Sequence, residues 1–194
     1  MSDSKNLTEK QISSDLIFDG KVLHLYRDVI ELPNGKEGFR EFCRHIGAVC
    51  VVPVTDEGEV ICVRQYRYAI GQSIIEIPAG KLDSRDEDPR EAALRELREE
   101  TGAICSRLTY MGKYYSSPAI LDECIHMYLA EGLTFGDTDP DEDEFIELLK
   151  IPVDELTHMI MNGEIVDGKT QAAVMRAAVT IAARKETNDN GEEQ

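Results

Sequence analysis

One strongly marked helix stands in the middle of this chain, between segments that favour strands. Asp88 is a good N-cap, Pro89 suits the first helical position, and Glu91 completes a capping box. Gly102 fits the left-handed position that ends such a helix. The sequence therefore predicts a helix from Asp88 to Thr101, held in place at both ends by its own residues.

Apolar and β-branched residues mark short segments on both sides of this helix. The segments expected to form strands are 21–32, 38–45, 47–54, 59–66, 73–77, 110–115, 125–129 and 145–151. The turn residues at 33–35 and 55–58 join the first four segments as two hairpins. Helical periodicity returns only at 153–161 and 170–183. The predicted fold class is α+β.

Length and charge exclude several classes of protein. The chain has 194 residues, which predicts one main domain with a small appended piece. Its 21 basic residues against 38 acidic ones give a net charge of −17. A protein of this charge would repel nucleic acids and anionic membranes, so we expect neither a nucleic acid nor a membrane as a partner. A phosphate-bearing substrate would need local arginine, lysine or bound metal to approach this protein.

The five cysteines are isolated, with no CxxC pair among them, which is typical of free thiols in a reducing compartment. No leader pattern and no run of 18 apolar residues is visible, so we expect a cytoplasmic location. Residues 1–14 and 185–194 are polar and aperiodic, and both ends are expected to be flexible.

Three acidic residues on the predicted helix point to a metal. Glu96, Glu99 and Glu100 are spaced i, i+3 and i+4, which puts them within ~100° of arc. They lie beside the apolar residues Ala93 and Leu97, whereas an ordinary charged helix would keep its acids on the solvated side. Repelling carboxylates at a buried edge are tolerable when a hard divalent cation neutralises them, which indicates Mg²⁺, with Mn²⁺ also possible.

The same helix carries a longer pattern. Gly80, Glu87 and the run from Arg95 to Ala103 (RELREETGA) resemble the Nudix box, G-x5-E-x7-R-E-U-x-E-E-x-G-U, where U is apolar. Seven fixed letters at ~7% each match by chance with a probability on the order of 10⁻⁸ per starting position. Six residues, 81–86, separate Gly80 from Glu87 where the pattern has five. An insertion in this loop leaves the helical acids unchanged.

Flanking residues are similar to the ADP-ribose pyrophosphatase branch of the Nudix hydrolases. The similar segments are Arg40-Glu41, 63–67, 77–80, Ser117-Pro118 and Asp122-Glu123. Ala119 stands where that branch usually has glycine. The resemblance implies a Nudix α/β/α sandwich with a mixed β-sheet at 46–184, preceded by an antiparallel strand extension at 15–45. It also implies a homodimer in which these strands help to build the partner's site.

The resemblance further implies hydrolysis of the pyrophosphate bond of ADP-ribose to AMP and ribose 5-phosphate. Glu96 and Glu100 are the expected metal ligands, with Glu99 third and the carbonyl oxygen of Ala79 as a further ligand. The residues expected to contact substrate are Arg40, Arg67, Pro118 and Glu123. Arg67 could instead be an ordinary charge at a strand end.

A general base is expected from the acidic run 141–145. Glu142 is the first candidate by resemblance, and Glu144 could serve in its place or contact a metal. Glu99 is retained as a further catalytic candidate. The alternative for this run is a solvated connector, since the glycine and glutamate spacing of a calcium-binding EF-hand is absent.

Other choices stay open at this point. Arg95 is better explained as a structural bridge to Glu91 and Glu99 than as a catalytic group. Tyr26, Tyr66 and Tyr68 are candidates for stacking on a base, and none can be placed. A nucleotide sugar is an alternative substrate, and a binding module without catalysis is a second alternative, although every carboxylate of the box is present.

Overall fold

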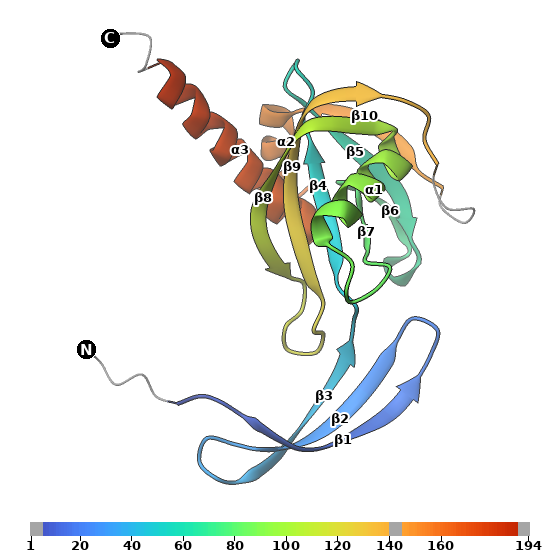
Figure 1. Ribbon diagram of the computed structural model, residues 1–194, viewed down its shortest axis with the longest axis vertical. Coiled ribbons are helices and arrows are strands. Elements are labelled where there is room, and N and C mark those ends of the chain that lie inside the picture. The colour runs from blue at the N-terminus through green and yellow to red at the C-terminus, as the bar shows by residue number, and fades with distance from the viewer. Residues whose placement is uncertain (1–5, 140–144, 190–194) are drawn as a thin grey trace. The chain divides into compact units, whose positions relative to one another are not determined.

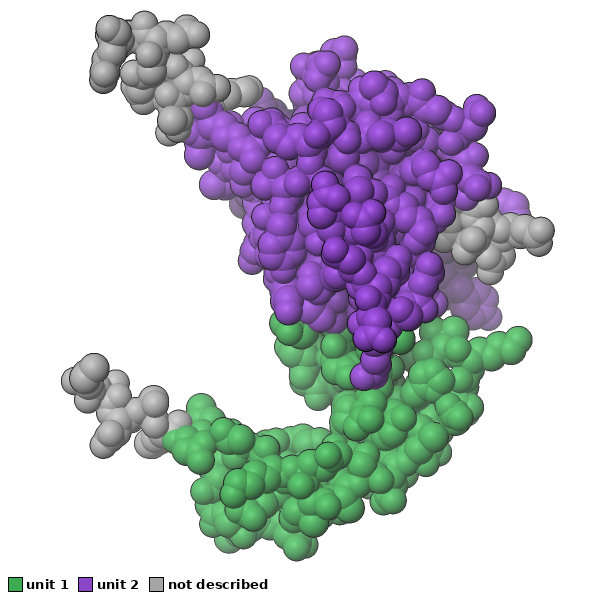
Figure 2. All heavy atoms as spheres, in the orientation of Figure 1, with its two compact units in different colours: residues 1–46, 115–123 green, residues 47–114, 124–194 purple. Residues whose placement is uncertain are grey.

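The computed structural model describes residues 6–139 and 145–189. The chain divides into two compact units (Figure 2). Unit 1 comprises residues 1–46 and 115–123, and unit 2 comprises residues 47–114 and 124–194. No helix among the described residues is long and apolar enough to cross a membrane.

Unit 1 is built on an antiparallel sheet of three strands, in the order β1-β2-β3 (Figure 1). Its strands are β1 (Lys10–Asp19), β2 (His24–Glu31) and β3 (Glu37–Arg44). Gly35, with φ of +79°, turns the chain between β2 and β3 as the sequence predicts. The segment 115–123 joins the unit through the amide of Cys43, which donates to the carbonyl of Ile120 at 2.8 Å. Strand β1 begins at Lys10, so residues 10–14 are extended and paired with β2, whereas the sequence predicts a flexible terminus there.

Unit 2 contains two sheets, with the strand orders β10-β5-β6 and β7-β4-β9-β8. Their strands are β4 (Ala48–Pro53), β5 (Glu59–Arg67), β6 (Gln72–Glu76), β7 (Ala79–Lys81), β8 (Ala103–Tyr115), β9 (Cys124–Phe135) and β10 (Glu147–Pro152). Strand β4 pairs in parallel with β9 and antiparallel with β7, so the second sheet is mixed. A 3₁₀ turn, η1 (Tyr68–Ile70), links β5 to β6.

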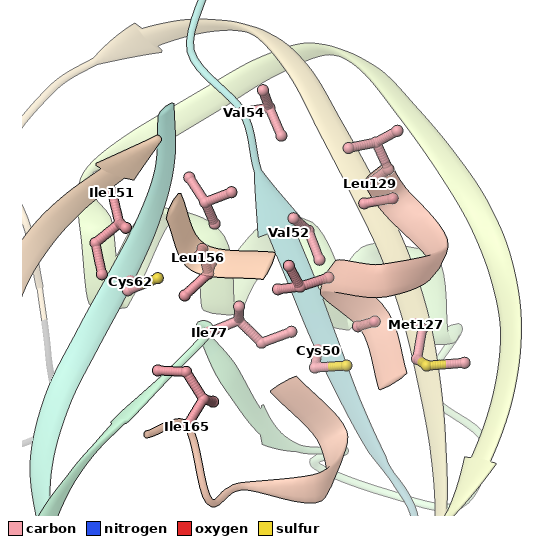
Figure 3. Packing of buried hydrophobic residues seen from close by; sticks show 14 of the residues in the cluster. Cys50, Val52, Val54, Cys62, Ile77, Met127, Leu129, Ile151, Leu156 and Ile165 are labelled. Atoms are coloured by element: carbon pink, nitrogen blue, oxygen red, sulfur yellow. The ribbon is translucent and has the colours of Figure 1, made fainter. Parts of the chain in front are cut away.

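Alternate residues of β4 face two separate cores. Cys50 and Val52 pack with the buried residues of α2 (Val153–Met161) and α3 (Gly168–Asp189) (Figure 3). Val49 and Val51 pack with the apolar face of α1 (Pro89–Thr101) on the other side. Successive side chains of a strand point to opposite faces of the sheet, so a strand that is covered on both faces contributes to two cores. This arrangement confirms the predicted α/β/α sandwich with a mixed sheet.

Helix α1 has the termini that its sequence predicts. The Asp88 carboxylate accepts a 2.9 Å bond from the amide of Arg90, and Gly102 ends the helix with φ of +69° while its amide donates to the carbonyl of Arg98. Glu91 does not act as predicted in a capping box. Its carboxylate accepts from the Arg90 side chain at 3.2 Å, because that cation lies one residue away.

Candidate functional site

The three acidic residues of α1 gather beside β7, where the chain enters the box loop. Glu100 is only 4% exposed, and its Oε2 accepts a 3.1 Å hydrogen bond from the amide of Ala79. Glu96 and Glu99 are partly buried on the same face, with side chains 12% and 27% exposed. The predicted shared face of these residues is therefore present. A carboxylate this deeply buried has to be stabilised by charge or hydrogen bonds.

Gly80 leaves the space that the Glu96 carboxylate fills. A β-carbon built on Gly80 would lie 2.0 Å from Cδ and from Oε1 of Glu96. The backbone of β7 thus approaches the helix more closely than any other residue type would allow at this position. The approach brings Ala79, expected to offer its carbonyl oxygen, next to the acidic face of α1.

Arg95 joins these carboxylates to the box loop. Its Nη1 donates to Glu96 Oε1 at 2.7 Å and to Glu99 Oε2 at 3.1 Å, and its Nε donates to Glu87 Oε1 at 3.4 Å. Burial acts to lower the pKa of Arg95, but the bonds to these carboxylates outweigh it and raise the pKa. The predicted bridge to Glu99 is present. The predicted bridge to Glu91 is wrong, because the loop residue Glu87 and the neighbouring Glu96 take its place.

The oxygen donors on this face are of the chemical type that binds a hard divalent cation. Carboxylate and carbonyl oxygens are the ligands that Mg²⁺ and Mn²⁺ prefer. Across residues 6–139 and 145–189, no three acidic, histidine or cysteine side chains already meet around one point. Among the described residues, Arg95 partly neutralises the carboxylates of Glu96 and Glu99 through its ion pairs with them.

A second polar centre lies at the end of β6. Arg67 donates from Nε to Glu76 Oε1 at 2.7 Å and from Nη2 to Oε2 at 2.5 Å, while Lys169 Nζ lies 2.6 Å from the same Oε2. Burial acts to raise the pKa of Glu76, but the two cations outweigh it and hold the pKa below its ordinary value. Sequence reasoning missed Glu76 and Lys169, because the two residues stand 93 positions apart.

The first turn of α3 holds this centre in position. Oδ2 of Asp167 accepts from Lys169 Nζ at 3.0 Å, from the Thr170 amide at 2.9 Å and from the Thr170 hydroxyl at 2.6 Å. The Thr170 hydroxyl oxygen also accepts a 3.0 Å bond from the amide of Ile77. Ile77 precedes Ala79 by two residues. One short segment is therefore held by α3 at Ile77 and by α1 at Ala79.

Three of the residues expected to contact substrate belong to unit 1. Arg40 donates to Glu9, through Nε at 3.0 Å and through Nη2. Glu123 accepts a 2.8 Å bond from the Ser116 hydroxyl and lies 3.7 Å from the ring of His45. Pro118 is in the turn that follows Ser117. Within unit 1, then, Arg40 and Glu123 each have a charged or polar partner.

The segment that precedes the acidic run in the sequence is hydrogen-bonded to the end of α1. The amide of Gly136 donates to the carbonyl of Gly102 at 2.8 Å, and the amide of Asp139 donates to the carbonyl of Glu99 at 2.9 Å. Glu142 and Glu144, the candidate bases, lie outside the described residues. Asp139, whose amide is bonded to the backbone of the metal-ligand candidate Glu99, is thus three positions before Glu142 in the sequence.

The candidate stacking residues differ in their surroundings. Tyr26 is stacked on Phe42, with 6.1 Å between ring centroids, and the Arg44 guanidinium lies 4.2 Å from the Tyr26 ring. Tyr66 and Tyr68 are exposed in unit 2, and Tyr68 is 90% accessible.

Known proteins share both the sequence and the fold of this chain. The NUDIX domain model matches residues 44–172. The ADP-ribose pyrophosphatase of Bacillus subtilis (strain 168) is 44% identical over 172 residues, which cover 88% of this chain and 92% of that protein. The methanol dehydrogenase activator of Bacillus methanolicus is 45% identical over 172 residues, with the same shares covered. A crystal structure of an ADP compounds hydrolase has the same fold, with a TM-score of 0.83 at 21% identity over 93% of this chain and 98% of that chain. With the family model matching well over half of its length, this chain belongs to the NUDIX domain family and is a Nudix hydrolase.

Proposed function

We propose that this protein hydrolyses the pyrophosphate bond of ADP-ribose and releases AMP and ribose 5-phosphate. The observation that carries the proposal is the packing of the acidic face of α1 against Ala79 and Gly80. A relative named ADP-ribose pyrophosphatase, which aligns over most of both chains, supports ADP-ribose as the substrate. Box residues determine the reaction in such a fold, whereas the surrounding loops select the substrate.

Nudix hydrolases generally use a divalent metal, and we propose Mg²⁺ here, with Mn²⁺ as a substitute. Glu96, Glu99, Glu100 and the carbonyl of Ala79 are the residues that would hold it. When bound, such an ion neutralises charge on the phosphoryl oxygens and lowers the pKa of a coordinated water. Burial of Glu100 and the bond from the Ala79 amide keep that carboxylate in one orientation. Arg95 orients Glu96 and Glu99 through charged hydrogen bonds.

We assign to Arg67 the role of supplying a permanent positive charge for the diphosphate. Its side chain is 42% exposed, although its guanidinium is bonded to Glu76. Arginine is suited to this role because its planar group can donate two parallel hydrogen bonds to a phosphate. The net charge of −17 makes such local cations necessary for an anionic substrate.

We assign the general base to Glu142, with Glu144 as the second candidate. The bond from Asp139 to the Glu99 carbonyl supports this assignment. Glu142 is three positions after Asp139, and three residues of extended chain span at most roughly 10 Å, a length compatible with a base acting at the acidic face of α1. A base has to come within ~3 Å of the attacking water, and a loop can reach this distance after substrate binds.

We propose a homodimer in which the amino-terminal strands of one subunit complete the site of the other, with Arg40, Pro118 and Glu123 contacting substrate. Large apolar side chains are exposed on the described part of unit 1: Ile12, Leu16, Ile17, Phe18, Leu23 and Phe39. Exposed apolar groups of this density are typical of a surface that a partner covers. Sedimentation at micromolar concentration tests this proposal, since a monomer with full activity would contradict it.

The thiols support a reducing, cytoplasmic compartment. All five cysteines are free. Burial raises the pKa of Cys50 and of Cys62 to about 12, so both remain protonated core groups.

A substrate panel tests the proposed specificity. We expect kcat/KM for ADP-ribose to exceed that for nucleotide sugars such as GDP-mannose by at least tenfold, and a chelator to abolish both rates. A higher kcat/KM for a nucleotide sugar would overturn the substrate and leave the reaction class standing. Binding of ADP-ribose without turnover in Mg²⁺ and in Mn²⁺ would instead favour the non-catalytic module.

A further inference from the structure

The carboxylate of Glu76 is shared between two cations that differ in exposure. Arg67 has a side chain 42% exposed, whereas the side chain of Lys169 is 12% exposed and that of Glu76 only 2%. Both Arg67 Nη2 and Lys169 Nζ bind the same oxygen, Oε2. Arg67 is thus the outer partner of a buried carboxylate, and Lys169 is the inner one.

Lys169 is itself held by a second carboxylate. Its Nζ lies 3.0 Å from Oδ2 of Asp167, which also caps the first turn of α3 through the Thr170 amide. Arg67, Lys169, Glu76 and Asp167 together sum to zero formal charge. When Arg67 leaves this group, Glu76 still keeps a 2.6 Å charged hydrogen bond from Lys169.

We propose that Lys169 is a positioning residue that releases Arg67 for the substrate. It takes over the buried Glu76 carboxylate when the Arg67 guanidinium turns from Glu76 to a phosphate oxygen. This proposal rests on the proposed function, in which Arg67 contacts the diphosphate. Lys169 itself does not touch substrate.

The physical basis is the cost of an unpaired buried charge. A carboxylate that is almost fully buried and loses its last cation is strongly destabilised. With Lys169 present, the departure of Arg67 removes one of two cationic partners. Without Lys169, the departure of Arg67 would remove the last one, so Arg67 would stay on Glu76 and bind substrate poorly.

The charged group around Glu76 is connected to the acidic face of α1 through residues 76–79. Glu76 is followed by Ile77, whose amide donates to Thr170 of α3, and two residues later the Ala79 amide donates to Glu100. The hydrogen bonds to Glu76 do most to raise the pKa of Arg67, and the charges of Asp167 and Glu100 add to this effect. Arg67 therefore lies within the electrostatic range of the proposed metal ligands.

Steady-state kinetics of Lys169→Met test the proposal, using whichever diphosphate the wild-type enzyme cleaves. Methionine keeps the apolar stem and removes the charge. We expect KM to rise at least tenfold while kcat stays within threefold, and Lys169→Arg to restore KM. Lys150→Met is the matched control: Lys150 lies over the Phe135 ring, outside this group, and both constants should stay unchanged.

A double-mutant comparison separates release of Arg67 from a general structural effect. In a Glu76→Gln background, where no buried carboxylate retains Arg67, Lys169→Met should change KM by less than twofold. An unchanged KM in the single variant, or a tenfold rise that persists in the Glu76→Gln background, would overturn the proposal. If the wild-type protein cleaves no diphosphate, the proposed function fails instead, which is a distinct result.

Asp167→Asn provides a second test should Lys169→Met fail to fold. Asparagine keeps an oxygen that can accept from the Thr170 amide but removes the carboxylate that competes for Lys169. Lys169 should then bind Glu76 more firmly, and KM should fall by about two- to fivefold. A rise in KM would contradict the proposed release of Arg67.

Discussion

The Glu96 carboxylate occupies the space that a side chain on Gly80 would require, with Cδ only 2.0 Å from the position of the missing β-carbon. Gly80 does not have a positive φ, so its role is to leave space and not to permit an unusual backbone conformation. The absence of one side chain on β7 therefore determines where a metal-ligand candidate of α1 can lie.

Gly80→Ala should displace Glu96 and lower kcat by about 10² or more, because catalytic ligands tolerate little displacement. Cooperative thermal unfolding should persist, since the change is a single methyl group. Gly38→Ala is the control, because its new β-carbon would meet Leu32 at an ordinary 3.4 Å. Full activity of Gly80→Ala would show that Glu96 can move without consequence.

Glu96→Gln and Glu100→Gln should each reduce turnover by roughly 10³-fold or more, because a neutral amide is a weaker ligand for Mg²⁺ than a carboxylate. In Glu100→Gln the oxygen of the new side-chain amide could still accept from the Ala79 amide, so the fold should be retained. Glu99→Gln should cost less, since Glu99 is the most exposed of the three. Calorimetric titration with Mn²⁺ would show whether the loss of turnover follows a loss of metal. Near-native rates in the first two variants would place the metal site elsewhere.

Glu142→Gln should lower kcat by about 10² or more with little change in KM, which is the pattern expected when proton transfer is lost. Glu144→Gln is the matched variant in the same loop. If only Glu144→Gln shows this pattern, the roles of the two residues are exchanged. If both variants stay active, the acidic run is a solvated connector.

The stability of the protein should depend on Glu76 at acidic pH. Its pKa in the folded state lies below the ordinary value of 4.5, because Arg67 and Lys169 outweigh the effect of burial. The unfolded chain therefore binds this proton more readily, and the stabilisation is complete above about pH 5 and is lost as the pH falls through the lowered pKa. In denaturant unfolding from pH 6 to pH 3, Glu76→Gln should show a shallower decline than the wild type. Parallel curves would contradict the assigned shift.

Local signals are sufficient to predict α1. The cap at Asp88, the proline beside it and the glycine at 102 all act within the helix or next to it, and the structure confirms both ends. The acidic face follows from the same helical spacing. The β-branched residues of β4 likewise predict a strand, and the two cores on its faces confirm the sandwich.

Contacts between distant segments cannot be predicted in this way. Strand β1 contains Ser13, Ser14 and Asp15 and has no apolar alternation, and it is extended because it pairs with β2. Helix α3 continues to Asp189, through residues 185–189 that the sequence assigns to a flexible tail. No spacing rule indicates that Lys169 meets Glu76. Resemblance marks Arg67 as a candidate substrate contact but not the buried carboxylate that holds it.

The most direct measurement is the ³¹P NMR spectrum of ADP-ribose incubated with the protein and Mg²⁺. We predict that the two coupled diphosphate resonances disappear and that two monophosphate singlets, from AMP and ribose 5-phosphate, replace them in equal amounts. The same sample with excess chelator, or with Glu96→Gln, should keep the diphosphate signals. Persistence of those signals in the wild-type sample with Mg²⁺ and with Mn²⁺ would contradict the proposed reaction.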